Sequence, residues 1–270
     1  MARTRRALAA VLLLTALIGC GKDEPPAPVV KATPTPAADN AAAPVKTVEA
    51  TAPVNAADGA TITGKVIFEG TPPPQKKVDM SVEPHCANEH ADGAPREDVV
   101  VNPNGTLKNV LICIRRGLEG KKFALPAEPV VLLQKGCTYT PHLLGIMVGQ
   151  TLIVRNGDPL THNIHGLPVK NSEFNFGQSK QGMENSLVFD APEVLIRVKC
   201  DVHPWMQAWI GVLADPFFAV TGDDGTFTLK GLPPGTYTVG AWHEKLKPEQ
   251  TQEVTLGAKE KKELNFKFKP

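Results

Sequence analysis

The chain has 270 residues, and its 29 Lys and Arg against 28 Asp and Glu leave a formal charge of +1. A nearly neutral chain is not typical of nucleic-acid binding, which needs a concentrated basic patch to replace phosphate counterions. Hydrophobic residues make up 42% of the chain, too many for a wholly disordered protein. The 25 prolines exceed the usual share of roughly 5%. Because proline is poorly tolerated inside helices and central strands, we expect a Pro-rich linker and many turns.

The N-terminal residues have the pattern of a bacterial export signal. Three arginines precede the apolar run 7–18, which is too short to span a membrane as a helix. The run ends in Leu-Ile-Gly-Cys, which resembles the lipobox of bacterial lipoproteins. That resemblance implies a signal peptide over residues 1–19 and lipid attached to Cys20; a secretory signal with an incidental cysteine is the alternative. Loss of the three arginines would leave 26 basic against 28 acidic residues, a charge of −2.

Residues 20–60 are predicted to form a disordered tether. Residues 21–60 hold seven prolines and twelve alanines and lack Leu, Ile and aromatic residues, so they cannot bury a core. Gly21 follows Cys20, instead of the Asp associated with inner-membrane retention in enteric bacteria. The lipoprotein resemblance therefore implies the periplasmic face of the outer membrane, with the lipid as the membrane contact.

The remaining residues have the pattern of an all-β chain. Apolar residues alternate with polar ones in short runs bounded by Pro, Gly or Asn, and amphipathic helical periodicity is not evident. The predicted strands are 62–69, 99–101, 107–114, 130–133, 146–154, 186–198, 208–213 and 264–268. Short strands joined by tight turns indicate Greek-key β-sandwiches.

The C-terminal part resembles a known type of β-sandwich. Residues 221–240 contain Asp-Gly-Thr-Phe-Thr-Leu and then Gly-Leu-Pro-Pro-Gly-Thr-Tyr-Thr-Val, which resemble the carboxypeptidase regulatory-like (transthyretin-like) domain. Residues 216–270 offer only about four strands, which are marginal as an isolated sandwich. We expect the N-terminal β segment 61–129 to supply further strands to it, with residues 130–215 inserted between the two parts.

The inserted residues contain an ordered set of metal-binding side chains: His162, Cys200, His203 and Met206. A thiolate and two imidazoles form a trigonal plane that suits copper, with a thioether as a weak axial contact. Such a site favours one-electron transfer because little ligand movement accompanies the change between Cu(I) and Cu(II). Zinc is the main rival metal, since thiolate and imidazole suit it too. A disulfide is the alternative use of Cys200.

The residues around this set resemble the cupredoxin family over roughly 130–214. The stretches that carry the resemblance are Tyr-Thr-Pro-His at 139–142, Val-Gly-Gln-Thr-Leu-Ile-Val at 148–154, Asn-Gly-Asp at 156–158, Thr-His-Asn at 161–163 and Lys-Cys-Asp-Val-His-Pro-Trp-Met at 199–206. It implies a cupredoxin-like sandwich with one type 1 copper ion, bound by the four residues above, and a role for Asn163 in tying the ligand loops together. Only two residues separate His203 from Met206, fewer than simple cupredoxins usually have, so a short ligand loop is expected and Met206 is the least secure ligand.

Other cysteines and histidines have plainer uses. Cys86 and Cys137 lie in polar, turn-like segments and could form a disulfide, whereas Cys113 lies in an apolar run and is expected to be a buried thiol. His85, Cys86, Glu89 and His90 also have the look of a metal cluster. His165 is expected to be a loop histidine at the solvent edge, with service as an alternative ligand as the second interpretation, and His142 is expected to pack behind the site.

These patterns predict a lipid-anchored periplasmic copper protein that carries single electrons between redox proteins such as a cytochrome or an oxidoreductase. We do not expect an enzyme, because no nucleophile–base pair or paired carboxylates occur in a recognisable motif. Pro204, Trp205 and Trp209 could form the face on which a partner docks. The alternatives are a non-redox binding module, for copper delivery or surface adhesion, and a degenerate cupredoxin that holds no metal.

Overall fold

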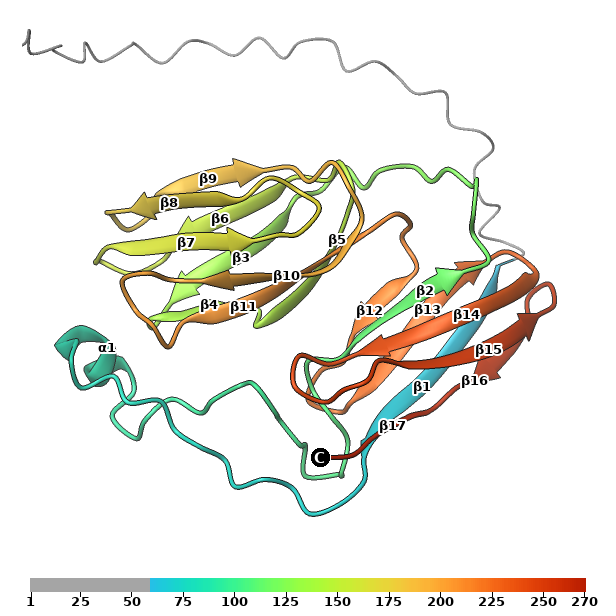
Figure 1. Ribbon diagram of the computed structural model, residues 1–270, viewed down its shortest axis with the longest axis horizontal. Helices are drawn as coiled ribbons and strands as arrows, with labels where there is room; N and C mark the ends of the chain where they lie inside the picture. The colour runs from blue at the N-terminus through green and yellow to red at the C-terminus, as the bar shows by residue number, and fades with distance from the viewer. Residues whose placement is uncertain (1–58) are drawn as a thin grey trace, which may run out of the picture. The chain divides into compact units, whose positions relative to one another are not determined.

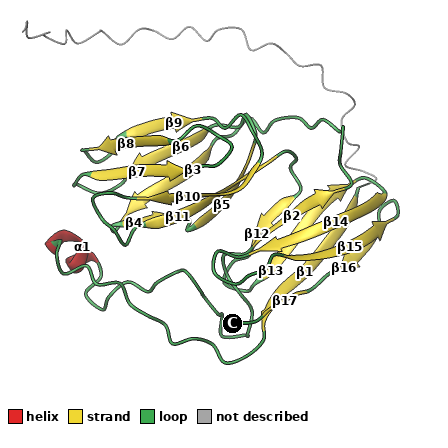
Figure 2. Ribbon diagram, in the orientation of Figure 1, coloured by secondary structure: helices red, strands yellow, loops and turns green. Residues whose placement is uncertain are grey.

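The computed structural model describes residues 59–270 (Figure 1). The predicted signal peptide, Cys20 and nearly all of the predicted tether lie outside the described residues. Within the described part, strands and loops dominate, with a single six-residue helix (Figure 2). The prediction of an all-β chain is confirmed. No helix in this part of the chain has the length and apolar character that crossing a membrane requires.

Residues from both ends of the described chain form one sandwich, which we call the host sandwich. One sheet has the order β13-β1-β16, with β17 also paired to β1, and the other has the order β12-β2-β14-β15. Its strands are β1 (Ala60–Phe68), β2 (Leu111–Arg116), β12 (Phe218–Val220), β13 (Thr226–Leu232), β14 (Gly235–Trp242), β15 (Gln250–Leu256), β16 (Lys261–Glu263) and β17 (Phe266–Phe268).

The middle of the chain forms the second sandwich, which we call the inserted sandwich (Figure 1). Its sheets have the orders β5-β11-β10-β7-β8 and β4-β3-β6-β9. Its strands are β3 (Val130–Lys135), β4 (Thr138–Thr140), β5 (Leu143–Met147), β6 (Leu152–Asn156), β7 (His162–Leu167), β8 (Phe174–Gln178), β9 (Glu184–Leu187), β10 (Glu193–Lys199) and β11 (Gln207–Leu213). The helix α1 (Pro84–Glu89) lies in the long connection between β1 and β2.

Strand β1 shows why N-terminal residues belong to the host sandwich. Its buried residues alternate, with Ile62, Val66 and Phe68 in the host core. Gly64, at a central position, is in contact with the neighbouring backbone, because an added Cβ would lie 1.8 Å from the carbonyl oxygen of Leu264. The strand pairs antiparallel with β13 and parallel with β16 and β17, so it sits inside its sheet and not at an edge.

Strand β2 is apolar on both faces because each face contacts a different core. Ile112 packs in the host core, whereas Leu111 and Cys113 pack against Leu143 and Leu213 of the inserted sandwich. Burial of each such aliphatic side chain contributes about 2 kcal/mol. The continuous apolar run of β2 is therefore explained by its position at the junction between the two sandwiches.

Several strand boundaries differ from the predicted ones. Residues 146–154 form parts of two strands, because a turn containing Gly149 at φ 83° separates β5 from β6. Residues 186–198 are likewise divided between β9 and β10, and residues 99–101 supply only an isolated bridge from Val101 to Leu107. The region 216–270 contains six short strands instead of about four.

Candidate metal centre

Three of the four predicted ligands converge at one end of the inserted sandwich. His162 is the first residue of β7, Cys200 follows the last residue of β10, and His203 lies in the turn before β11. Strands β7 and β10 are antiparallel neighbours, so the start of one lies beside the end of the other. The long sequence gap between His162 and Cys200 is therefore closed by sheet pairing.

The side chains of these three residues point toward one another. The two Nδ1 atoms of His162 and His203 are 3.1 Å apart, and the Sγ atom of Cys200 is 3.8 Å from Nδ1 of His203. One ligand atom from each residue lies within 4.8 Å of the others, and the residues are 0%, 2% and 3% exposed for His162, Cys200 and His203. Burial lowers the pKa of both imidazoles, which keeps them neutral with lone pairs available to a metal ion.

Two backbone N–H groups donate to the sulfur of Cys200. They belong to Asn163, at 3.4 Å, and to His203, at 3.3 Å. The side chain of Asn163 also accepts from the backbone N–H of Asp201 at 3.0 Å, so this residue joins the two ligand segments. This is the placement that the cupredoxin resemblance implied for Asn163.

Met206 is buried in the same loop, and two hydrogen bonds of its backbone close the loop. Its N–H donates to the carbonyl oxygen of His203 at 2.9 Å, and its own carbonyl accepts from the N–H of Cys200 at 3.2 Å. The side chain belongs to the core of the inserted sandwich. Its service as an axial ligand stays a prediction.

Asp158, which was not predicted to belong to the site, forms a hydrogen bond with the ring of His162. Oδ2 of Asp158, which is 0% exposed, lies 2.8 Å from Nε2 of His162. Burial alone would raise the pKa of Asp158, but hydrogen bonds from the N–H groups of Cys137 and Gly136 outweigh it and hold the pKa below its ordinary value. The ionised carboxylate accepts the Nε2 proton, leaving Nδ1 as the ligand atom. Asp158 stands in the sequence only as part of an Asn-Gly-Asp-Pro turn, four residues before His162.

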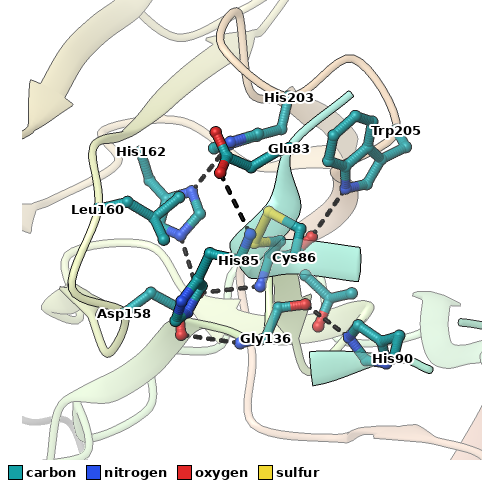
Figure 3. Close-up of a disulfide and its surroundings, with 12 residues drawn as sticks. Glu83, His85, Cys86, His90, Gly136, Asp158, Leu160, His162, His203 and Trp205 are labelled. Atoms are coloured by element: carbon teal, nitrogen blue, oxygen red, sulfur yellow. Dashed lines mark hydrogen bonds and ion pairs between the residues drawn. A yellow bond between two sulfur atoms is a disulfide. The ribbon is translucent and has the colours of Figure 1, made fainter. Parts of the chain in front are cut away.

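Cys86 and Cys137 form a disulfide next to the two histidines (Figure 3). Both sulfur atoms lie within 4.8 Å of a ring nitrogen of His203. The sulfur atom of Cys137 also lies within 4.8 Å of a carboxylate oxygen of Asp158 and a ring nitrogen of His162. The bridge joins α1 to the turn between β3 and β4. We call residues 77–95 the cap; its ends are joined by an isolated bridge between Lys77 and Pro95. The cap therefore closes the site on the side of the imidazole rings.

The metal cluster suggested by residues 85–90 is not formed. Cys86 is in the disulfide, and Nε2 of His90 is 2.6 Å from the carbonyl oxygen of Gly136. Nε2 of His85 is buried without a hydrogen-bond partner.

His165 does not join the ligand set either. Its ring nitrogens lie 2.8 Å from Glu173 and 2.9 Å from Asp201, and the hydrogen bond that Glu173 accepts is the main cause that raises the pKa of His165. Cys113 is a buried free thiol, as expected, and burial raises its pKa to about 12.

Two residues expected near the site lie at the junction with the host sandwich. Nε2 of His142 is 2.5 Å from Oε1 of Glu244, and the same histidine lines a cleft together with Trp205 and Met206 of the ligand loop. The ring of Trp209 packs against that of Trp242, with centroids 5.5 Å apart. Of the proposed docking residues, Pro204 is exposed and Trp205 is half-buried.

Comparison with known proteins supports the assignment of the C-terminal part of the host sandwich. Residues 213–269 match the family model of the carboxypeptidase regulatory-like domain. No curated protein sequence matches the chain significantly.

Solved structures similar to part of the chain include copper proteins. A copper-containing nitrite reductase from Thermus scotoductus SA-01 is 24% identical over 37% of this chain and 25% of its own, with a TM-score of 0.31. A purple cupredoxin from Nitrosopumilus maritimus is 24% identical over 31% of this chain and 99% of its own, with a TM-score of 0.28. A reduced amicyanin mutant is 22% identical over 33% of this chain and 86% of its own, with a TM-score of 0.29. The chain thus spans a quarter of the reductase's length, and the case for a metal site rests on its own side chains.

Proposed function

We propose that the inserted sandwich binds one copper ion and that the protein carries single electrons between redox partners. The observation that supports this is the convergence of Cys200, His162 and His203, which are all buried and have ligand atoms within 4.8 Å of one another. A thiolate and two imidazoles are a donor set that suits copper. When bound there, copper would supply a one-electron couple between Cu(I) and Cu(II).

The chain's own residues are arranged to keep such a site rigid. Asp158 fixes the ring of His162, and Asn163 ties the segment of Cys200 to β7. The cap keeps water from the imidazoles through the buried disulfide. Rigid ligands favour electron transfer, because neither oxidation state then requires the site to rearrange.

Burial of the ligands weighs against copper delivery, the alternative function. A delivery protein must hand its ion to another protein's ligands, whereas here the three ligand residues are almost inaccessible. Zinc fits the donor set chemically. We therefore include zinc as the competing metal in the test.

The decisive experiment adds Cu(II) to a soluble form starting at residue 59. We expect an intense thiolate-to-copper absorption band in the visible and a matching EPR signal, both lost in Cys200→Ser. Cys113→Ser serves as the control, since that thiol lies in the junction with the host sandwich and should leave the band unchanged. A colourless protein that binds Zn²⁺ tightly would contradict the electron-transfer proposal.

We further propose that the protein is not an enzyme and is held by lipid on Cys20 at the periplasmic face of the bacterial outer membrane. The lipobox-like sequence and the Pro- and Ala-rich residues after it support this location. Metabolic labelling with a radioactive fatty acid, lost in Cys20→Ser, tests the anchor.

A further inference from the structure

The imidazole edge of the candidate site is closed to a partner. His203 is 3% exposed and the disulfide of the cap lies beside it. The indole of Trp205 packs on the ring of His203, with centroids 5.2 Å apart, and its Nε1 donates to the carbonyl oxygen of Cys137 at 3.1 Å. Trp205 is itself half-buried, so it connects the closed site to the surface.

Trp205 and Met206 line a cleft of about 510 Å³. Strand β10, the start of β11, both ends of the cap and the loop after β14 contribute to its walls. The cleft therefore lies beside the ligand loop and offers an approach that the cap leaves open.

The charged groups of this cleft are mainly cationic. Four side chains are basic, those of Lys77, Arg96, Arg197 and Lys245, and two are acidic, those of Asp79 and Glu97. Oδ1 of Asp79 accepts the backbone N–H of Ser81, and Oε2 of Glu97 lies 4.0 Å from Nδ1 of His142. Neither of these two contacts is to one of the four basic side chains of the cleft.

Three of the four cations lack a counter-ion. Lys77 contacts the carbonyl oxygen of Asp92, and Arg96 pairs with Asp98 at 3.3 Å. Arg197 and Lys245 are exposed, and the described residues provide no carboxylate within ion-pair distance of either. Unpaired cations in a concave wall attract anions and accelerate their encounter with the surface.

We infer that this cleft is the docking surface for a redox protein that presents carboxylates, and that Trp205 connects it to the metal site. The inference rests on the proposed electron-transfer function and names the chemistry of its partner. In the exchange, one electron passes to the partner's acceptor as Cu(I) becomes Cu(II), with no bond or proton transferred. The cations come from separate segments of the chain, as expected for a surface that receives several carboxylates of a protein.

The test uses the copper(I) form of the chain from residue 59 and the anionic oxidant hexacyanoferrate(III). In Arg197→Glu/Lys245→Glu, the second-order rate constant of oxidation at low ionic strength should fall about tenfold. With the cationic oxidant tris(phenanthroline)cobalt(III) the same variant should react faster. The matched control is Lys180→Glu/Lys230→Glu, which makes the same charge change at exposed positions outside the cleft and should alter both rates much less.

A second arm asks whether the cleft takes carboxylates of a polypeptide. Poly-L-glutamate should slow the oxidation of the parent protein by hexacyanoferrate and leave Arg197→Glu/Lys245→Glu unaffected. No slowing by the polymer would overturn the assignment to an acidic protein surface, and equal effects of the cleft and control variants would overturn the cleft itself. Failure of the proposed function is distinguishable, because a protein without the thiolate-to-copper band never reaches the kinetic experiment.

Discussion

The Asp158 carboxylate binds both the metal-site histidine His162 and the turn that carries the disulfide. It accepts from Nε2 of His162 and from the N–H groups of Gly136 and Cys137. One buried acid therefore sets the position of an imidazole and of the loop that closes over it.

Asp158→Asn should weaken copper binding by roughly ten- to a hundredfold, as is usual when the outer partner of a ligating histidine is changed. The amide keeps an acceptor for His162 but loses the negative charge that stabilises the bound cation. Competition with chelators of known affinity measures the effect. Asp223→Asn, at an exposed position paired with Lys108, is the control. Equal affinities in the two variants would assign Asp158 a purely structural role.

Reduction of the Cys86–Cys137 disulfide should loosen the cap and accelerate metal release to a chelator. The bridge closes a loop with a sequence separation of 51, so its loss should lower the free energy of unfolding by about 4 kcal/mol. Stopped-flow chelation and urea unfolding, each with and without dithiothreitol, measure the two effects. Cys86→Ala/Cys137→Ala should match the reduced protein and ignore the reductant. Release rates that do not change on reduction would show that the cap does not limit access.

The buried His243 should make the metal-free protein less stable in mild acid. Burial lowers its pKa to about 4, and its Nδ1 accepts from the N–H groups of Lys245 and Leu246. The folded state therefore binds this proton less readily than the unfolded state, whose pKa is near 6.5. The contribution is fully present above pH 6.5 and falls by about 3 kcal/mol as the pH decreases toward 4.

Urea unfolding between pH 7.5 and 4.5 tests this, with His243→Asn as the variant that retains an acceptor without a titrating ring. Asp215 acts in the opposite direction, because burial raises its pKa to about 6 and it therefore favours the folded state as the pH falls. The difference between the parent and His243→Asn isolates the histidine. Parallel stability curves for the two proteins would contradict its assignment.

The hydrogen bond between His142 and Glu244 should couple the unfolding of the two sandwiches. Both side chains are about 5% exposed or less, and Oε2 of Glu244 has no further partner. Glu244→Ala removes the hydrogen-bond partner of a buried imidazole and should cost about 2 kcal/mol. Calorimetry should then resolve two transitions where the parent shows one. His142→Ala/Glu244→Ala should recover part of the lost stability, because neither polar group is left unpaired. A single transition in all variants would show that the apolar contacts of the junction are enough to couple the two sandwiches.

The sequence predicted the features whose ligand motif or hydrophobic periodicity lies within a few consecutive residues. The Cys-x-x-His-x-x-Met spacing around Cys200 predicted a ligand loop, and alternation in 62–68 predicted β1 and its buried face. The structure brings His162, Cys200 and His203 of the predicted ligand set together, and their binding of a metal ion stays a prediction.

Features that depend on distant pairing were not predictable in the same way. Glu244 meets His142 across 102 residues, and neither lies in a pattern that points to the other. A disulfide and backbone hydrogen bonds hold the cap in place, and its residues lack the hydrophobic periodicity that would have predicted a cover over the site. Asp158 sits in a turn motif, where an Asp is expected for local reasons alone.

The insertion has a consequence for how the protein bears force. The chain leaves the host sandwich after β2 and returns at β12, and these strands are antiparallel neighbours, with Ala219 opposite Ile112. Tension between the N-terminal segment and the C-terminal strand is transmitted through β1 and its parallel partners β16 and β17. The inserted sandwich lies outside that load path, so the metal site would keep its geometry while the host sandwich is pulled.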